Sequence, residues 1–479
     1  MRAYVGIDVG TTNTKILVVT KNGIEKIHRL QTARKTIHNV EFFDMDRIEK
    51  GLRKMLNSLR ETYQISGIAC TSVGESVVPV TSGKKLHDPI VWYDTCTKTL
   101  YEEYRNLVDQ LAPYSVSGSR DIYYYSLYKI LYMQRKGLVD PGEVEYWLPV
   151  SSYIAYRLTG NAVWDMTQAY RSHMVDIHRR CWNEELLRAF NIPVERLGKL
   201  AYTSSFVGYH AGIPVFLAGH DHLTGTYGLI SLFGSELIFD SMGTASYTVG
   251  VATEKGDELH LERPFMKTGG NIGIAFQDRQ YYLASGLRFH GKLIELVLRF
   301  FNLKVSSKRF EKLNQSISEV PTDCAFCIYA NGDNIVGEDV DGINFVQIPP
   351  DCSQEQVLQS VYLYLCYTSR ITVETLRRML GRLPIVLGGS LVENKIFMRY
   401  KASMLNETLY YLNTAELTAL GAAIAAIKGA KDEETFQSLR DKVSFQKIEP
   451  HPEDVLKMNE LYQRMNAQYE KLLQRRGGQ

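Results

Sequence analysis

The alternation of apolar and polar residues at the start of the chain predicts three antiparallel strands in a meander. The first strand is expected over residues 3–8, a polar turn follows it, and the second strand covers residues 15–19. Asn22-Gly23 is a strong signal for a two-residue hairpin turn, so a third strand is expected over residues 24–30.

A helix and a further strand follow this meander. Apolar residues recur at spacings of three and four over residues 48–63, which predicts an amphipathic helix with Asp46 as its N-cap. Residues 67–73 form an apolar run that ends at Gly74-Glu75, and this run predicts a buried strand. Three strands, a helix and another strand are the pattern that opens an α/β domain.

A similar pattern starts again in the middle of the chain. Residues 238–240 lead through Gly243-Thr244 into an apolar run, much as residues 7–8 lead through Gly10-Thr11 into the second strand. This repetition predicts an internal duplication. The remainder of the second half alternates between helices and strands, which are expected over residues 355–380, 383–387, 396–405, 408–412 and 417–427.

No low-complexity linker separates the two halves. We therefore expect two domains, residues 1–230 and residues 231–479, that meet directly and hinge between Gly228 and Gly234.

Composition narrows the class of protein. Hydrophobic residues make up 45% and charged residues 23% of the 479 residues, and 55 basic residues nearly balance 53 acidic ones. No global charge therefore draws the chain to nucleic acid or to a membrane. No run approaches the ~18 apolar residues that span a bilayer, and the chain opens directly on a strand-like run. With seven scattered cysteines, we expect a reducing compartment, the cytoplasm.

The sharpest candidate for chemistry is the polar turn between the first two strands. Glycine permits a tight turn, consecutive N–H groups and hydroxyls can face a polyphosphate, and a lysine adds positive charge. Asp8, at the strand end, could hold Mg²⁺ through waters. The turn leads into a strand rather than a helix, so it is not a Walker A loop, and the alternative is a polar hairpin without a ligand. The candidate phosphate ligands are Gly10, Thr11, Thr12, Asn13, Thr14 and Lys15.

Two glycine turns in the second half are weaker candidates. Gly243-Thr244 would be an opposing phosphate clamp, although such turns are often only structural. Gly388-Gly389 follows an apolar strand and precedes a helix that carries Asn394, which suits close approach of the backbone to a nucleotide. Neither turn alone predicts a nucleotide site, but the combination with the polar turn near the N-terminus favours one.

Asp221 follows the apolar run of residues 214–218 within a Gly-His-Asp-His segment. An aspartate just past a strand can accept the proton of a substrate hydroxyl during phosphoryl transfer. Two alternatives remain open. Asp221 could cap the following helix, or His220 and His222 could bind a transition metal, although no third ligand is evident.

Two further clusters have ordinary explanations. Cys324 and Cys327 form a single C-x-x-C without a second pair, so we interpret both as core cysteines. The tyrosines at positions 123, 124, 125 and 128 are either packing residues or a platform on which a sugar stacks.

Taken together and in order, these segments resemble the FGGY family of carbohydrate kinases, which is related to hexokinase, actin and the heat-shock chaperone ATPases. The resemblance covers most of the chain. It rests on DVGTTNTK at 8–15, IVWYD at 90–94, SSYIAYRLTG at 151–160, DMTQAY at 165–170, PVFLAGHDH at 214–222, MGTAS at 242–246, GGSLVENKIFM at 388–398 and LTALGAAIAA at 417–426.

The resemblance implies an α/β fold of two duplicated ribonuclease-H-like domains with a cleft between them. It also implies ATP and Mg²⁺ as cofactors, with Asp221 as general base and Asp8 placing the metal. The phosphates would be held by residues 10–15 and Gly243-Thr244, and the adenosine would lie by Gly388-Gly389 and Asn394. The residues expected beside the sugar are Glu75, Trp92, Asp94, Tyr124 and His222.

Departures from the family pattern bear on the substrate. Gly74 stands where glycerol kinases carry an arginine, which argues against glycerol and predicts room for a larger sugar. Xylulose kinases usually carry Met-His around Gly74-Glu75, and this difference argues against xylulose. Cys96 replaces the arginine that commonly follows W-x-D, and residues 359–370 keep the later family signature poorly. The histidines that flank Asp221 look more like the fuculose-kinase relatives.

The sequence therefore predicts an ATP-dependent kinase for a hydroxyl of a small sugar, a ketose such as a pentulose or a 6-deoxyhexulose like L-fuculose. A nucleotide-dependent switch or chaperone-like ATPase, or a catalytically weak sugar-binding pseudokinase, are the alternatives on the same fold. A small-molecule sugar is the expected partner, with neither nucleic acid nor membrane, and a homodimer is a possible assembly.

Overall fold

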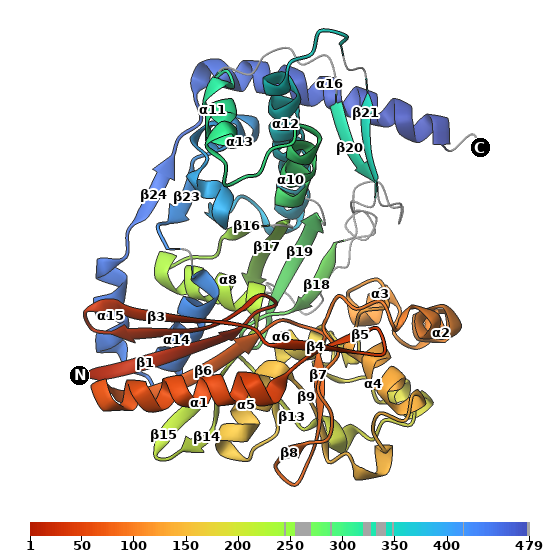
Figure 1. Ribbon diagram of the computed structural model, residues 1–479, viewed down its shortest axis with the longest axis vertical. Coiled ribbons are helices and arrows are strands. Elements are labelled where there is room, and N and C mark those ends of the chain that lie inside the picture. Colours follow the sequence, from red (N-terminus) through yellow and green to blue (C-terminus); the bar gives the residue numbers. More distant parts are fainter. Residues whose placement is uncertain are drawn as a thin grey trace.

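The structure is a computed structural model of the chain. It describes residues 1–243, 246–253, 270–287, 290–319, 327–331, 342–346, 349–414 and 416–476. Thr244 and Cys324, two residues of the predicted motifs, lie outside these ranges. Each half of the chain contains a mixed sheet with helices around it, and Figure 1 shows the N-terminal half below the C-terminal half.

The first sheet contains the predicted meander. Among the described residues its strand order is β14-β15-β6-β1-β2-β3. The meander strands pair antiparallel, β6 runs parallel to both β1 and β15, and β14 closes one edge antiparallel. The strands are β1 (Arg2–Val9), β2 (Asn13–Thr20), β3 (Gly23–Gln31), β6 (Gln64–Ser72), β14 (Phe206–His210) and β15 (Ile213–His220).

The second sheet, within the same described ranges, has the order β18-β19-β17-β16-β22-β23-β24. Its strands are β16 (Ile238–Met242), β17 (Ser246–Thr253), β18 (Asn271–Ile274), β19 (Gln280–Leu287), β22 (Ile385–Gly388), β23 (Leu409–Leu412) and β24 (Phe445–Ile448).

The two sheets share one topology. The order β3-β2-β1-β6-β15-β14 recurs as β19-β17-β16-β22-β23-β24, with antiparallel pairs and parallel pairs at corresponding places. The predicted two-domain α/β fold with an internal duplication is therefore confirmed.

The correspondence that the sequence suggested between Asp8 and Asp240 is wrong in register. The equivalent turns follow β1 at Gly10 and β16 at Gly243, so the residue two before the turn is Asp8 in one half and Ser241 in the other. Asp240 is one residue further from its turn and therefore points to the opposite face of the sheet. There it is fully buried and pairs with the equally buried Lys401 at 2.7 Å.

Helices cover both sheets. The helix predicted from residues 48–63 is α1, and Asp44 rather than Asp46 caps it, because the Asp44 carboxylate accepts the N–H of Arg47. The helices of the first half are α1 (Met45–Thr62), α2 (Lys98–Leu111), α3 (Tyr114–Ser117), α4 (Ser126–Arg135), α5 (Val150–Thr159), α6 (Met166–Tyr170), α7 (Glu184–Ala189) and α8 (Asp221–Phe233). Those of the second half are α10 (Gly291–Phe300), α11 (Lys308–Ser316), α12 (Gln354–Leu380), α13 (Lys395–Leu405), α14 (Leu417–Gly429), α15 (Glu433–Lys442) and α16 (Pro452–Arg476).

Short strands lie between these elements. In the first half they are β4 (Arg34–Ile37), β5 (Val40–Phe43), β7 (Val77–Thr81), β8 (Lys84–Lys85), β9 (Tyr146–Pro149), β10 (Val163–Asp165), β11 (Val175–Asp176), β12 (Cys181–Trp182) and β13 (Lys199–Ala201). In the second half they are β20 (Cys327–Asn331) and β21 (Gly342–Val346).

Helices α8 and α14 join the two halves. They pack so closely that a Cβ added to Gly421 would lie 2.0 Å from the carbonyl oxygen of Thr224, and one added to Gly228 would lie 2.7 Å from the Cα of Gly421. Helix α14 also packs on the first sheet, where the carbonyl of Ala419 leaves no room for a side chain at Gly6. The predicted hinge, Gly228–Gly234, is the last part of α8 and its left-handed C-cap.

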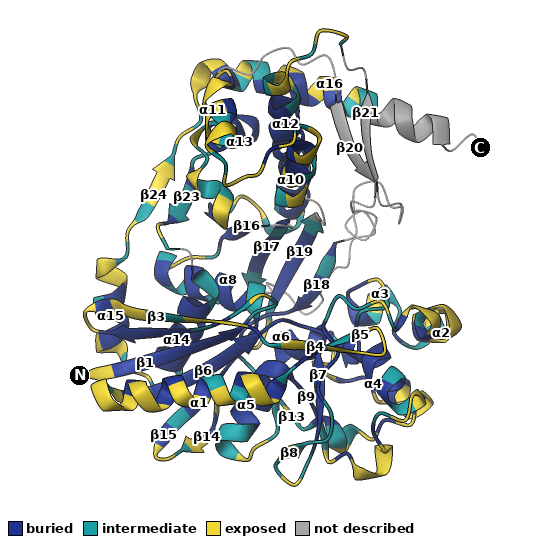
Figure 2. Cartoon of the chain, viewed as in Figure 1, coloured by how far each residue is buried: buried dark blue, intermediate teal, exposed yellow. Residues whose placement is uncertain are grey.

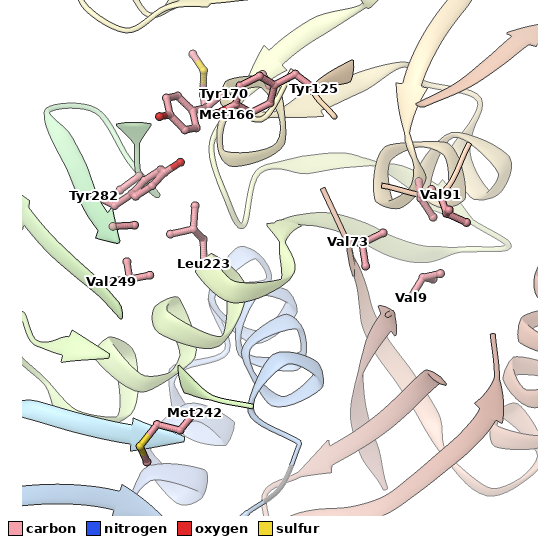
Figure 3. Close-up of a cluster of buried hydrophobic side chains, with 14 of the residues drawn as sticks. Val9, Val73, Val91, Tyr125, Met166, Tyr170, Leu223, Met242, Val249 and Tyr282 are labelled. Carbon is pink, nitrogen blue, oxygen red and sulfur yellow. The ribbon is translucent and has the colours of Figure 1, made fainter. Parts of the chain in front are cut away.

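Burial follows the layers. Figure 2 shows buried strands in both sheets and a helix α1 that is exposed along its outer side. The apolar core is continuous across the halves, because the rings of Tyr170 in α6 and Tyr282 in β19 meet edge to face at 5.3 Å. Figure 3 shows these two tyrosines near Leu223 of α8 and Val249 of β17. In the described part of the chain, no helix has the length and apolar character that crossing a membrane requires.

Candidate active site

Three carboxylates lie at one edge of the first sheet. Strands β15, β6 and β1 are neighbours that run in the same direction. Asp221 directly follows β15, Glu75 lies in the turn after β6, and Asp8 is the penultimate residue of β1. The carboxyl ends of parallel strands are where ligands bind in α/β sheets. The fold therefore brings the predicted base, sugar anchor and metal ligand to a common edge.

Thr32 fixes the polar turn after β1 through two hydrogen bonds. Its hydroxyl donates to the carbonyl of Gly10 at 2.8 Å, and its N–H donates to the carbonyl of Thr12 at 2.9 Å. The side chain of Thr14 is buried against Thr32, whereas Thr12 is exposed. The turn thus has a fixed backbone, and the Thr14 hydroxyl already has a partner within the protein.

Lys15 is oriented by the second half of the chain. Its Nζ lies 2.6 Å from Oε2 of Glu416, the residue before α14, and 4.0 Å from Oδ2 of Asp8. Arg29 binds the other oxygen of Glu416 at 2.8–2.9 Å. Glu416, which sequence reasoning missed, therefore holds the lysine of the phosphate turn beside Asp8.

Asp8 is buried and incompletely paired. Its Oδ1 has no hydrogen-bond partner within the described part of the chain. Burial raises the pKa of Asp8 to about 7, with Lys15 opposing the rise and Asp221 adding to it. A buried carboxylate with an open oxygen and a second carboxylate nearby suits a cation. These residues fit Mg²⁺, which keeps most of its waters and takes one or two carboxylates.

Asp221 is the first residue of α8. His220 occupies the N-cap position, and Oδ1 of Asp221 accepts the N–H of His222 at 2.7 Å. Asp221 is therefore not the helix cap, and its bond to His222 occupies one carboxylate oxygen only, which is compatible with a role as base. The side chain is about one-fifth exposed, which leaves it accessible to a substrate hydroxyl.

Glu75 is held in an unusual conformation. Its φ is +61°, a left-handed backbone that costs a non-glycine residue roughly 1 kcal/mol or more. The hydroxyl of Ser126, at the start of α4, donates to the Glu75 carbonyl at 3.1 Å and fixes the turn. A strained residue that is buried and carries a carboxylate is typical of a functional position.

The partner of Glu75 is Arg171. The guanidinium of Arg171 donates from Nε at 2.7 Å and from Nη2, both to Oε1 of Glu75. In the described part of the chain Oε2 accepts no hydrogen bond, and its contact with a sugar hydroxyl remains a prediction. Arg171 directly follows the motif DMTQAY and was not part of it. Sequence spacing therefore gave no signal for the Arg171–Glu75 pair.

The prediction that Gly74 leaves room for a larger sugar is wrong. A Cβ built on Gly74 would lie 2.7 Å from Cδ2 and 3.0 Å from Nε2 of His220, so that ring fills the space. The argument against glycerol also weakens, because Arg171 supplies a guanidinium to Glu75 from another element. His220 is buried, and burial lowers its pKa to about 4, so the ring is neutral near pH 7.

Trp92 connects the predicted sugar site with the phosphate turn. Its indole N–H donates to the hydroxyl of Thr11 at 2.9 Å, and its ring meets Tyr124 edge to face at 6.4 Å. The fully buried Lys129 donates to the carbonyls of both Trp92 and Tyr124, at 3.0 and 2.7 Å. Burial lowers the pKa of Lys129 to about 8. Lys129 was missed by the sequence analysis, although a single lysine within the apolar run of α4 was a signal for a buried functional residue.

The carboxylate of Asp94 is bonded to backbone N–H groups within the protein. One carboxylate oxygen accepts the N–H of Cys96 and the other accepts the N–H of Glu41, both at 2.8 Å. Its carboxylate therefore fixes the loop that carries Trp92, and its contact with a sugar remains a prediction.

The second-half turns adjoin one another. Gly389 has a φ of +94°, and a Cβ there would lie 2.2 Å from the carbonyl oxygen of Met242, the residue before Gly243. Asn394 caps α13 through Phe397, and its amide also donates to Tyr362 and Asn314 at 2.9 and 3.1 Å. Its side chain is thus engaged within the protein, and its place beside adenosine remains a prediction.

His222 faces the second sheet, where its ring lies 4.9 Å from that of Tyr247. The ring of His220 is 5.7 Å away. Among the described residues no group of three or more His, Cys, Asp or Glu side chains could hold a metal ion, so the two histidines lack a third ligand here.

Comparison with known proteins agrees with this geometry. Residues 3–228 match the N-terminal domain, and residues 241–430 the C-terminal domain, of the FGGY family of carbohydrate kinases. A glycerol kinase of Thermococcus onnurineus is 24% identical over 380 residues, 76% of this chain and 75% of that protein. An L-fuculokinase of Escherichia coli O157:H7 is 23% identical over 466 residues, 92% of this chain and 95% of that protein.

Solved structures show the same fold. The xylulose kinase from Rhodospirillum rubrum superposes with a TM-score of 0.85 at 18% identity, covering 98% of this chain and 99% of that one. The Plasmodium falciparum glycerol kinase with ADP gives a TM-score of 0.83 at 17% identity, covering 99% and 98%. With both family domains matched in order along most of its length, the chain belongs to the FGGY family of carbohydrate kinases.

Proposed function

We propose that this kinase transfers the γ-phosphoryl group of MgATP to a hydroxyl of a ketose, a pentulose or a 6-deoxyhexulose such as L-fuculose. The observation that carries the proposal is the row of three carboxylates, Asp8, Glu75 and Asp221, at the carboxyl edge of adjacent parallel strands. An L-fuculokinase that matches over 92% of this chain supports a ketose of this size.

Each carboxylate has a distinct part in this transfer. Asp221 accepts the proton of the sugar hydroxyl while the oxygen of that hydroxyl forms a bond to the γ-phosphorus. The bond from the γ-phosphorus to the bridging oxygen breaks, and ADP is released. Glu75, with Oε2 open, accepts hydrogen bonds from other sugar hydroxyls. Asp8 would hold Mg²⁺, which neutralises charge on the phosphate oxygens.

The remaining residues hold and orient. The backbone of residues 10–13 and the ammonium of Lys15 would hold the phosphates from the first half. Gly243 and Thr244, of which Thr244 lies outside the described residues, would hold them from the second. Gly388 and Gly389 allow the nucleotide to approach the backbone closely. Trp92 and Tyr124 offer aromatic faces to the sugar, and the Trp92–Thr11 bond relates the sugar site to the phosphate turn.

A substrate panel tests the proposal. ADP formation should be measured with purified protein, ATP and Mg²⁺ in the presence of D-xylulose, L-fuculose, D-ribulose, gluconate or glycerol. We expect a ketose to raise the rate of ADP formation at least a hundredfold above the rate without sugar. An ATP hydrolysis rate that no sugar changes would favour the switch-like ATPase, and a preference for glycerol would overturn the ketose assignment.

A further inference from the structure

The ring of His220 and the backbone of Gly74 form a tight pair between two groups of the active site. The Cδ2–Nε2 edge of the ring lies against the Cα of Gly74, where a methyl group would be 2.7 Å from Cδ2. Real side chains do not approach so closely, so any residue with a Cβ at position 74 requires the ring to move.

The backbone that carries the ring is held in place. Its backbone N–H donates to the hydroxyl of Thr167 at 2.9 Å, and the residue is the N-cap of α8. The Cβ of Arg171 lies 3.5 Å from the same point beside Gly74. The ring of His220 and the side chain of Arg171 therefore both border the space beside Gly74.

The pair also lies between the proposed base and the proposed sugar anchor. Nε2 of His220 is 3.5 Å from Oδ1 of Asp221, and Gly74 directly precedes Glu75. A sugar that presents one hydroxyl to Asp221 and others to Glu75 would therefore lie close to this ring.

We propose that His220 is a specificity-determining residue whose imidazole sets the depth of the sugar pocket between Asp221 and Glu75. This inference rests on the proposed function, and it adds a residue that selects among sugars by size. Removal of the ring deepens the pocket and favours longer substrates. Addition of a methyl group at position 74 forces the ring towards the substrate and disfavours all of them.

A double-mutant cycle tests the pairing. Values of kcat/KM for L-fuculose, D-xylulose and glycerol, together with melting temperatures, should be measured for Gly74→Ala, His220→Ala and the double variant. We expect Gly74→Ala to lower kcat/KM for the preferred ketose about tenfold or more, and to lower it less than threefold in the His220→Ala background. His220→Ala alone should raise the L-fuculose to glycerol ratio of kcat/KM by about tenfold.

His222→Ala is the matched control. This neighbouring histidine faces Tyr247 rather than Gly74, so its removal should not relieve Gly74→Ala. Equal effects of Gly74→Ala in all three backgrounds, or an unchanged sugar ratio in His220→Ala, would overturn the inference.

The failure of the proposed function gives a different result. If wild-type protein phosphorylates none of the sugars, the specificity role falls with the proposed function. The melting temperatures still report the steric pair, because Gly74→Ala should then destabilise the wild-type and His222→Ala proteins but not His220→Ala. Sugar phosphorylation without any coupling would instead leave the function standing and remove His220 as its selector.

Discussion

Replacement of Arg171 by leucine removes the guanidinium that faces Glu75 and leaves a carboxylate that is only 5% exposed without its cation. Loss of one partner of a buried ion pair costs about 3–5 kcal/mol, because the remaining charge is desolvated and unpaired. We therefore expect Arg171→Leu to lower the free energy of unfolding by an amount in this range. Glu75→Gln combined with Arg171→Leu should recover at least half of the loss, because the side chain at position 75 then carries no charge that has lost its partner.

The chain offers an exposed pair as a control. Arg135 and Glu103 are paired with both side chains 43% exposed, so water screens the interaction and Arg135→Leu should change stability little. The free energy of unfolding should be measured by urea unfolding, followed by circular dichroism, for the wild type, Arg171→Leu, the double variant and Arg135→Leu. The reasoning is refuted if Arg171→Leu and Arg135→Leu lose equal stability, or if the double variant is less stable than Arg171→Leu alone.

Three further predictions concern the helix crossing, the metal and the hinge. Gly421→Ala should lower the melting temperature, with a cost of about 1–3 kcal/mol, because its Cβ would strike the Thr224 carbonyl, whereas Gly225→Ala on the facing helix meets only ordinary contacts and should be tolerated; equal melting temperatures would contradict this. Because the pKa of Asp8 is about 7, its carboxyl is mostly protonated at pH 6 and mostly ionised at pH 8. The Mg²⁺ concentration for half-maximal rate should therefore be about tenfold higher at pH 6 than at pH 8, and a pH-independent value would refute the assignment of Asp8 as the metal ligand. The radius of gyration should fall when a ketose and a non-hydrolysable ATP analogue bind together, since the phosphate turns come from different halves; an unchanged value with confirmed binding would exclude closure.

Local patterns were sufficient to predict most elements of the first half. The meander and α1 follow from alternation and helical spacing, and both are confirmed. The hairpin is also present, but its two loop residues are Lys21 and Asn22 rather than Asn22 and Gly23, because Gly23 already pairs with Thr20 as the first residue of β3. The helix cap was assigned two residues late, because Asp44 and Asp46 are equally suitable by type and only the bond to Arg47 distinguishes them.

The contacts that shape the site could not be predicted in this way. Arg171 and Glu75 are 96 residues apart, and Lys15 meets Glu416 across nearly the whole chain. Such pairs depend on how the elements pack, and neither residue type nor spacing encodes them. Gly74 illustrates the same limit, since its missing side chain suggested open space, whereas His220 from another strand fills it.

The central claim is that Asp221 serves as the base for transfer to a sugar hydroxyl, and the Asp221→Asn variant tests it most directly. Asparagine preserves the size and the bond to the His222 N–H but cannot take the proton. Steady-state kinetics with the best ketose, and calorimetric titration with MgATP, should be measured for both proteins. We predict that kcat falls about a hundredfold or more while ATP affinity is retained; a kcat within tenfold of wild type would contradict the account.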